Sequence, residues 1–124
     1  MFDKLKAMGA VASLMKNQDG LRDAAARVRE KSEQTRVTGE AGGGACRVVA
    51  AGNMKIISVE LSSALVAGMA ADERTRQLAS SLVADAVNDA LRHAQERLQE
   101  QISVEAKALG LGDLPTGDLG GLLG

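Results

Sequence analysis

A chain of 124 residues with a formal net charge of −1 fits one small domain, and it lacks the overall positive charge typical of nucleic-acid binders. Phe2 is the only aromatic residue, so the core must consist of aliphatic and small side chains, part of it buried against a second copy. The single cysteine excludes an intrachain disulfide, and no apolar run approaches the roughly 18 residues of a membrane span. The N-terminus does not resemble a secretory signal, so we expect a cytoplasmic protein.

Residues 2–33 favour a helix, because apolar side chains recur every three or four positions along each half. Turn-forming residues cluster at positions 17–20, where the helix either continues or bends. Residues 1–33 contain seven basic and five acidic side chains, so positive charge lies toward this end. The apolar positions are Leu5, Met8, Ala12, Met15, Leu21, Ala25 and Val28.

Three strands are predicted next, over residues 35–39, 45–51 and 54–61. Alternation places Cys46, Val48 and Ala50 on one face of the second strand. Gly52-Asn53 is a signal for a two-residue hairpin, so the region is predicted to be an antiparallel meander. Residues 62–71 are predicted to be a connection to the next helix.

Four glycines lie within residues 37–49, VTGEAGGGACRVV, between the first two strands. A phosphate-binding P-loop ends in Gly-Lys-Ser/Thr and leads into a helix, whereas here Gly44 is followed by Ala45, Cys46 and a strand. The stretch is therefore interpreted as a turn in which glycine tolerates positive φ and close approach of another segment.

A long helix is predicted from Asp72-Glu73, which suit a helix N-terminus, to about Leu109-Gly110. A four-residue spacing of apolar side chains winds around this helix and indicates burial on more than one side. Residues 109–124 are rich in Gly and Leu and have no helical or strand period, so we expect a disordered tail. The spaced positions are Leu78, Leu82, Ala86, Ala90, Ala94, Leu98 and Ile102.

No catalytic, cofactor or metal site is predicted, because His93 and Cys46 are each the only residue of their type. His93 is interpreted as a partly solvated residue at the edge of the apolar stripe, and Cys46 as a small buried hydrophobic residue. Asp85 and Asp89 are one helical turn apart, as a metal or acid/base pair is, but a solvated helix face is the favoured interpretation.

Two segments together resemble the YbaB/EbfC family of bacterial nucleoid-associated proteins, over about residues 1–108. One is the Gly-rich loop of residues 37–44 with its following strand, and the other is the helix segment 82–90, LVADAVNDA, which contains Asn88-Asp89-Ala90. The resemblance implies an α+β protomer with an N-terminal helix, a three-stranded meander and a long C-terminal helix. It also implies an intertwined homodimer with projecting helical arms that binds double-stranded DNA in the nucleoid with little sequence preference. Enzymatic activity, a cofactor, a small-molecule substrate and a membrane role are not expected.

The basic residues of the N-terminal helix are the predicted DNA contacts, and a dimer doubles their number on paired arms. For each of them an ordinary solvated helix surface is the alternative. A helical scaffold of the same fold that binds a protein partner is the alternative function, because the chain is net acidic and the apolar segment 119–123 could dock in a groove. The predicted contacts are Lys4, Lys6, Lys16, Arg22, Arg27, Arg29 and Lys31.

Overall fold

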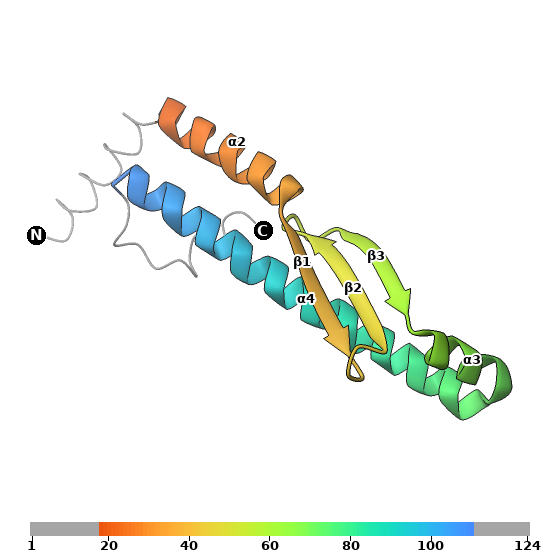
Figure 1. Ribbon diagram of the computed structural model, residues 1–124. Helices are drawn as coiled ribbons and strands as arrows, with labels where there is room; N and C mark the ends of the chain where they lie inside the picture. The colour runs from red at the N-terminus through yellow and green to blue at the C-terminus, as the bar shows by residue number, and fades with distance from the viewer. Residues whose placement is uncertain (1–17, 111–124) are drawn as a thin grey trace, which may run out of the picture.

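The computed structural model describes residues 18–110, and the predicted 109–124 tail therefore lies almost wholly outside the described part. In Figure 1 the long helix α4 extends along the described part, with the sheet on its middle, α2 beside its C-terminal half and α3 beside its start. This arrangement confirms the predicted α+β class. The elements are α2 (Gln18–Gln34), β1 (Arg36–Ala41), β2 (Cys46–Ala51), β3 (Ile56–Leu61), α3 (Ser63–Ala71) and α4 (Glu73–Ala108).

The sheet is an antiparallel meander in the order β1-β2-β3, as predicted. In the first pair of strands Val37 is opposite Ala50 and Gly39 is opposite Val48, so their inward positions form one buried patch. The β2–β3 register shifts by one residue between Val49 and Ala50, which marks a bulge in β3. Strand alternation was therefore sufficient to identify the face that packs on α4.

The two turns of the meander differ in how well the sequence predicted them. Between β1 and β2, Gly42, Gly43 and Gly44 all have positive φ, of 66°, 65° and 94°, which confirms the interpretation as a turn. The predicted two-residue turn at Gly52-Asn53 is wrong, because the connection extends from residue 52 to 55. Met54 lies within this connection and has a positive φ of 70°. The Gly-Asn signal did not predict a positive φ at this position.

The prediction of a plain connection over residues 62–71 is also wrong, since this segment contains the helix α3. Ser62 caps this helix by accepting a hydrogen bond from the Leu65 N–H at 3.1 Å. Asp72 then ends α3 and caps α4, accepting from the Arg74 N–H at 2.8 Å. The helix is apolar on nearly all sides, so the periodic signal of an amphipathic helix was absent.

The core lies between the sheet and α4, and small side chains bring the two unusually close. Ala86, Ala90 and Ala94 of α4 are fully buried against Val37, Cys46, Val48 and Ala50. A Cβ placed on Gly39 would lie 2.2 Å from the Ala90 backbone nitrogen and 2.4 Å from the Ala86 carbonyl oxygen. Only glycine allows β1 to approach the helix backbone so closely.

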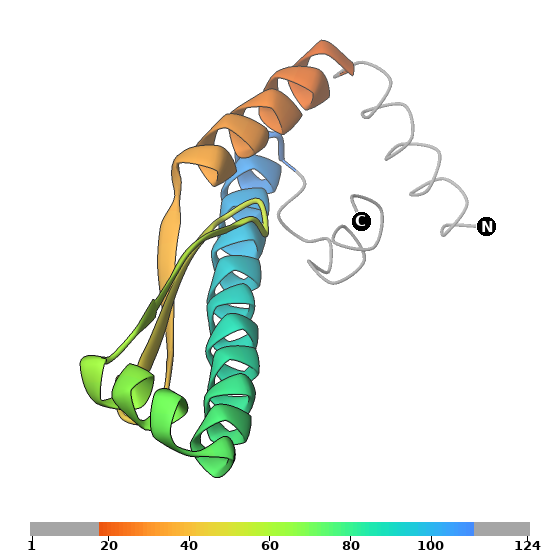
Figure 2. The ribbon, with the colours of Figure 1, turned by 90° about the vertical axis from the view of Figure 1, so that its right-hand side faces the viewer.

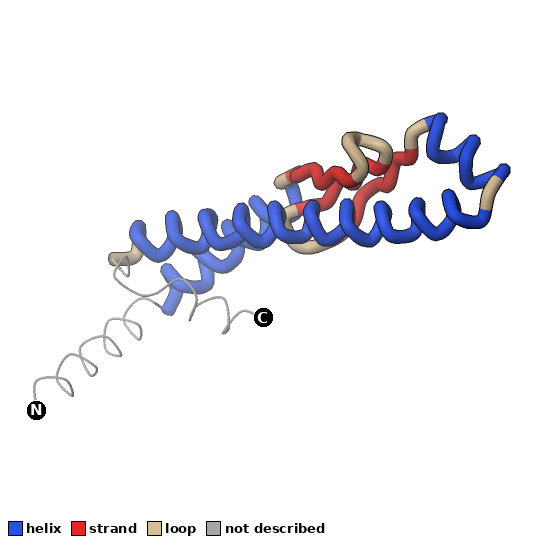
Figure 3. The backbone as a smooth tube through the Cα atoms, turned by 90° about the horizontal axis from the view of Figure 1, so that it is seen from below, coloured by secondary structure: helices blue, strands red, loops and turns tan. Residues whose placement is uncertain are grey.

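The side of the sheet formed by β3 is not covered in the same way. Figure 2 shows the sheet as a thin layer beside α4, and the packing of that helix is against β1 and β2. Val59 is paired with the fully buried Val48 yet is 45% exposed, and Ile57 is 51% exposed. Figure 3 shows α4 along the described part, with α2 and the sheet beside it.

Candidate nucleic-acid interface

The described part of the predicted DNA-contacting helix is α2, which pairs with the C-terminal half of α4 to form an arm beyond the sheet (Figure 1). Ala24 and Ser32 are its buried residues and face inward two turns apart. Of the predicted contacts, Arg22, Arg27, Arg29 and Lys31 lie on this helix, and all four are exposed. Lys4, Lys6 and Lys16 lie outside the described residues.

Arg27 is engaged by an acidic side chain of the neighbouring helix. Its Nη2 lies 2.9 Å and its Nε 3.1 Å from Oε2 of Glu105, in a two-pronged contact between α2 and α4. The hydrogen bond from Arg27 holds the pKa of Glu105 below its usual range, and the same contact raises the pKa of Arg27. Arg27 therefore stabilises the arm, and its charge is partly neutralised before any DNA approaches.

The other basic residues of α2 are not engaged in the way that Arg27 is. Within residues 18–110, Arg22, Arg29 and Lys31 make no ion pair with another side chain. Arg22 and Arg29 are seven positions apart, so their side chains leave nearly the same face of α2 two turns apart. These three cations are therefore the part of the predicted set that is exposed and outside any ion pair among the described residues.

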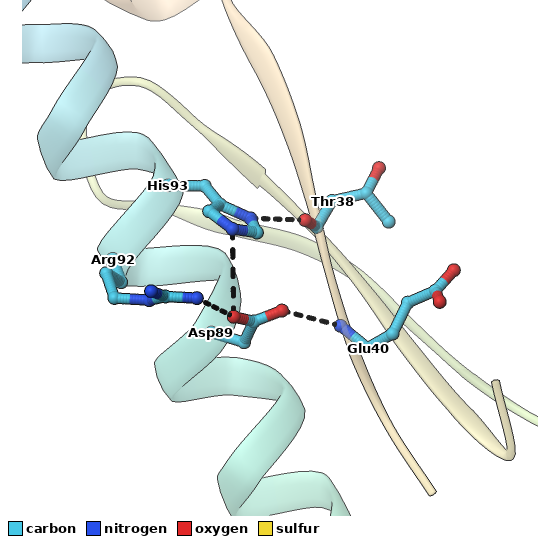
Figure 4. Close-up of polar contacts among 5 residues, drawn as sticks. All are labelled: Thr38, Glu40, Asp89, Arg92 and His93. Carbon is cyan, nitrogen blue, oxygen red and sulfur yellow. Dashed lines mark hydrogen bonds and ion pairs between the residues drawn. The ribbon is translucent and has the colours of Figure 1, made fainter. Parts of the chain in front are cut away.

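The two sequence segments that carry the family resemblance contact each other in the fold. Gly39 packs on Ala90, and the neighbouring Glu40 N–H donates a hydrogen bond to Oδ2 of Asp89 at 3.1 Å (Figure 4). Arg92 donates to Oδ1 of the same carboxylate at 2.7 Å, and together these donors hold the pKa of Asp89 below its usual range. Asp89 therefore connects α4 to the edge of the sheet, while Asp85 lies on the exposed face.

His93 adds a second contact from α4 to the same strand. Its Nδ1 lies 2.7 Å from the Thr38 carbonyl oxygen, so this nitrogen must carry a proton and donate. Its Nε2 faces Oδ1 of Asp89 at 3.7 Å (Figure 4). The predicted position at the edge of the apolar stripe is confirmed by the ring's partial exposure, and its contacts place it in the structure of the sheet edge.

Arg36 and Arg97 are basic residues that sequence reasoning did not select. They line a shallow hollow of about 370 Å³ between the start of β1 and α4, together with Val37, Thr38, His93 and Glu96. Arg36 follows α2 and Arg97 lies on the predicted long helix, so neither belongs to the N-terminal helix from which the candidates were drawn. Only the folded chain brings them together.

Neither Cys46 nor His93 belongs to a metal-ligating cluster among residues 18–110. Cys46 is fully buried in the core, and burial raises the pKa of its thiol, in agreement with its predicted role as a small hydrophobic residue. Among residues 18–110 no group of three or more metal-ligating side chains lies close enough to hold an ion. No helix in this same range is long and apolar enough to cross a membrane.

The sequence profile of the YbaB/EbfC DNA-binding family matches residues 8–109. The chain is a member of that family. It is also similar to the nucleoid-associated protein Pfl01_1806 of Pseudomonas fluorescens (strain Pf0-1), with 30% identity over 103 residues, 83% of this chain and 90% of the relative.

The YbaB/EbfC assignment agrees with a solved structure at the level of the fold. The chain resembles the crystal structure of the uncharacterized protein HP0035 from Helicobacter pylori with a TM-score of 0.56 and 22% identity. The match covers 70% of this chain and 86% of the other. The two proteins therefore share the fold of a sheet on a long helix.

In this YbaB/EbfC chain the total charge of α2 does not describe its surface, so the positions of its charged side chains must be considered. Helix α2 has four basic and four acidic residues, so it is neutral overall. Glu105 engages one of those cations from outside the helix. Any positive patch on the arm therefore depends on where individual side chains lie.

Proposed function

We propose that the protein binds double-stranded DNA as a homodimer in the nucleoid, with low sequence specificity and without catalysis. One observation carries this proposal: the α2–α4 arm presents Arg22, Arg29 and Lys31 exposed and without an acidic partner among the described residues. Membership of a DNA-binding family and a relative named as nucleoid-associated support it. Lys4, Lys6 and Lys16 complete the proposed contact set.

Low sequence specificity follows from the kind of contact these side chains make. Arginine and lysine on an exposed helix face reach phosphate oxygens, which are the same for every base pair. Their binding releases condensed counterions, so affinity must fall as salt rises. The arm is therefore expected to position duplex DNA through its backbone.

Homodimerisation is supported by the uncovered apolar side of the sheet. Ile56, Ile57 and Val59 of β3 are each at least 40% exposed, and β3 is also an outer strand with free backbone groups. A second copy of the same chain supplies a matching apolar surface and doubles the arms. Light scattering at micromolar concentration should give twice the protomer mass, and a monomer mass contradicts this part of the proposal.

DNA binding is tested by fluorescence anisotropy with a random-sequence duplex at rising salt. We expect an affinity at low salt tighter than about 10⁻⁴ M, the weak end of non-specific binding, and a linear fall of log affinity with log salt. Arg29→Gln should lower the steepness of that fall by about 1 for each phosphate that the variant no longer reaches.

Arg74→Gln is the matched control, because Arg74 lies in the first turn of α4 at the end of the sheet away from the arm (Figure 1). It removes the same charge and should leave the salt dependence unchanged. Equal effects of the two substitutions would show that total charge, not the arm, governs binding.

A further inference from the structure

The hollow between β1 and α4 has a lining in which basic side chains outnumber acidic ones. Arg36 enters it from β1 and Arg97 from α4, with Glu96 as the only carboxylate of the lining. His93 and Thr38 form part of the wall, fixed by the 2.7 Å hydrogen bond between them. Two arginines from separate elements therefore line one open depression.

These two arginines differ from the other arginines that the fold engages. The guanidinium groups of Arg27, Arg47 and Arg92 are paired with Glu105, Glu40 and Asp89. Neither Arg36 nor Arg97 makes an ion pair with any residue between 18 and 110. Their charge remains available to an anion from outside.

Arg36 is also held in place at the hollow by its backbone contacts. Its Nη1 donates to the carbonyl oxygens of Glu33 at 2.7 Å and Thr35 at 3.0 Å, at the C-terminal end of α2. The Nη2 and Nε groups are left with donors for another acceptor. A guanidinium group fixed in this way loses less side-chain freedom when it binds an anion.

We propose that this hollow binds a phosphate group of the DNA backbone, with Arg36 and Arg97 as the donors. The planar fork of arginine matches the oxygens of a phosphodiester better than any other side chain. The hollow follows directly after α2, whose Arg29 lies seven residues before Arg36, so the phosphate contacts extend from the arm onto the sheet edge. This inference rests on the DNA binding proposed above and adds a site outside the N-terminal helix.

Arg97→Gln is the cleanest test, because the guanidinium of Arg97 makes no ion pair among the described residues. In the full-length protein we expect DNA affinity at low salt to fall roughly threefold to tenfold, and the steepness of the salt dependence to fall by about 1. Arg36→Gln should have the same effect. Thermal unfolding by circular dichroism verifies that each variant is folded.

Glu96→Gln, at the same site, should change DNA affinity in the opposite direction. Removing the carboxylate from the lining should strengthen DNA binding by a similar factor, since it removes repulsion of the phosphate. Arg74→Gln and Glu73→Gln, in the first turn of α4, are the controls of equal charge change and should leave affinity unchanged.

The outcomes separate this site from the proposed function. If the unaltered protein fails to bind duplex DNA, the proposed function fails and this inference with it. If it binds DNA but Arg97→Gln and Glu96→Gln match their controls, only the assignment of a phosphate site to the hollow is wrong.

Inorganic phosphate serves as a second probe, and its binding is followed through the NMR signals of the His93 ring. Shifts with the duplex are expected at a concentration at which phosphate gives none, whereas shifts with phosphate and none with the duplex would overturn the assignment to DNA.

Discussion

The two outer strands of the sheet, β1 and β3, have opposite surroundings. The edge of β1 is capped by side chains of α4, since Asp89 accepts from the Glu40 N–H and His93 donates to the Thr38 carbonyl. The edge of β3 has no such cover from α4, and Ile57 and Val59 are about half exposed beside it. An exposed strand edge invites another strand, and within the described residues the fold caps one edge of the sheet and leaves the other uncovered.

This difference shows that one helix determines which side of the sheet is covered. Helix α4 packs through alanine against β1 and β2, and it makes no comparable packing with β3. The packing of the protomer is therefore concentrated on the β1 side, and the homodimerisation proposed above would use the β3 side. Substitutions on each side should separate these two properties.

The largest effect is expected from Gly39→Ala on the closed side. The new Cβ would lie within 2.7 Å of three backbone atoms of α4, and backbone cannot move aside as a side chain can. We expect a loss of more than about 4 kcal/mol in the free energy of unfolding, measured by circular dichroism in urea.

Gly43→Ala is the control for this substitution. Gly43 has positive φ, but no atom lies within 4 Å of a Cβ added there, so only backbone strain of about 1 kcal/mol is expected. A similar loss in both variants would show that strain in the loop, not close packing, limits the closed side.

On the open side, Ile57→Glu should convert the proposed dimer to a monomer while leaving the protomer folded. The side chain is 51% exposed, so the charge disturbs little within one protomer, but burying it unpaired against a second apolar β3 carries a large desolvation penalty. Light scattering measures the mass. Val104→Glu, at a position 60% exposed on α4, should remain dimeric, and a monomer from this control instead would place the interface on the arm.

A smaller effect is expected from Asp89→Ala, which removes a cap from the β1 edge. The Glu40 N–H loses its acceptor, and Arg92 loses its partner. We expect a lower thermal midpoint and new, irreversible self-association on standing, followed by light scattering over time. Asp85→Ala, one turn away and exposed, should change neither property.

The smallest expected effect is the pH dependence of stability that arises from Asp89. The pKa of Asp89 is lowered in the folded protein by Arg92 and the Glu40 N–H, so its contribution is complete above the ordinary aspartate range and is lost as pH falls through the folded pKa. Asp89→Asn should therefore unfold at a lower midpoint than the unaltered protein at neutral pH. The difference should shrink toward low pH, and a constant difference would assign the effect to packing.

The sequence predicted the elements that follow a regular period, and it failed where a role depends on distant residues. Alternation placed Cys46, Val48 and Ala50 on the inner face, and Asp72-Glu73 marked the start of α4. It missed α3, whose apolar residues surround the helix and leave no stripe.

At the candidate site, too, sequence reasoning failed where a role depends on residues far apart in the chain. The N-terminal cations were recognisable as a group, but the engagement of Arg27 comes from Glu105, 78 positions away. The structural role of Asp89 depends on a backbone N–H 49 positions earlier. The hollow at Arg36 and Arg97 required both β1 and α4 to be folded, so no local pattern indicated it.

The packing of the sheet on the alanines of α4 also has a consequence for how the chain is made. The last strand ends at Leu61, whereas the alanines that cover the sheet lie at positions 86, 90 and 94. At roughly 5–20 residues per second, synthesis of the intervening segment takes on the order of one to seven seconds. During that interval the face of Cys46 and Val48 has no cover, and both outer strands are open. The nascent chain is therefore most exposed to wrong pairing just before its last helix emerges.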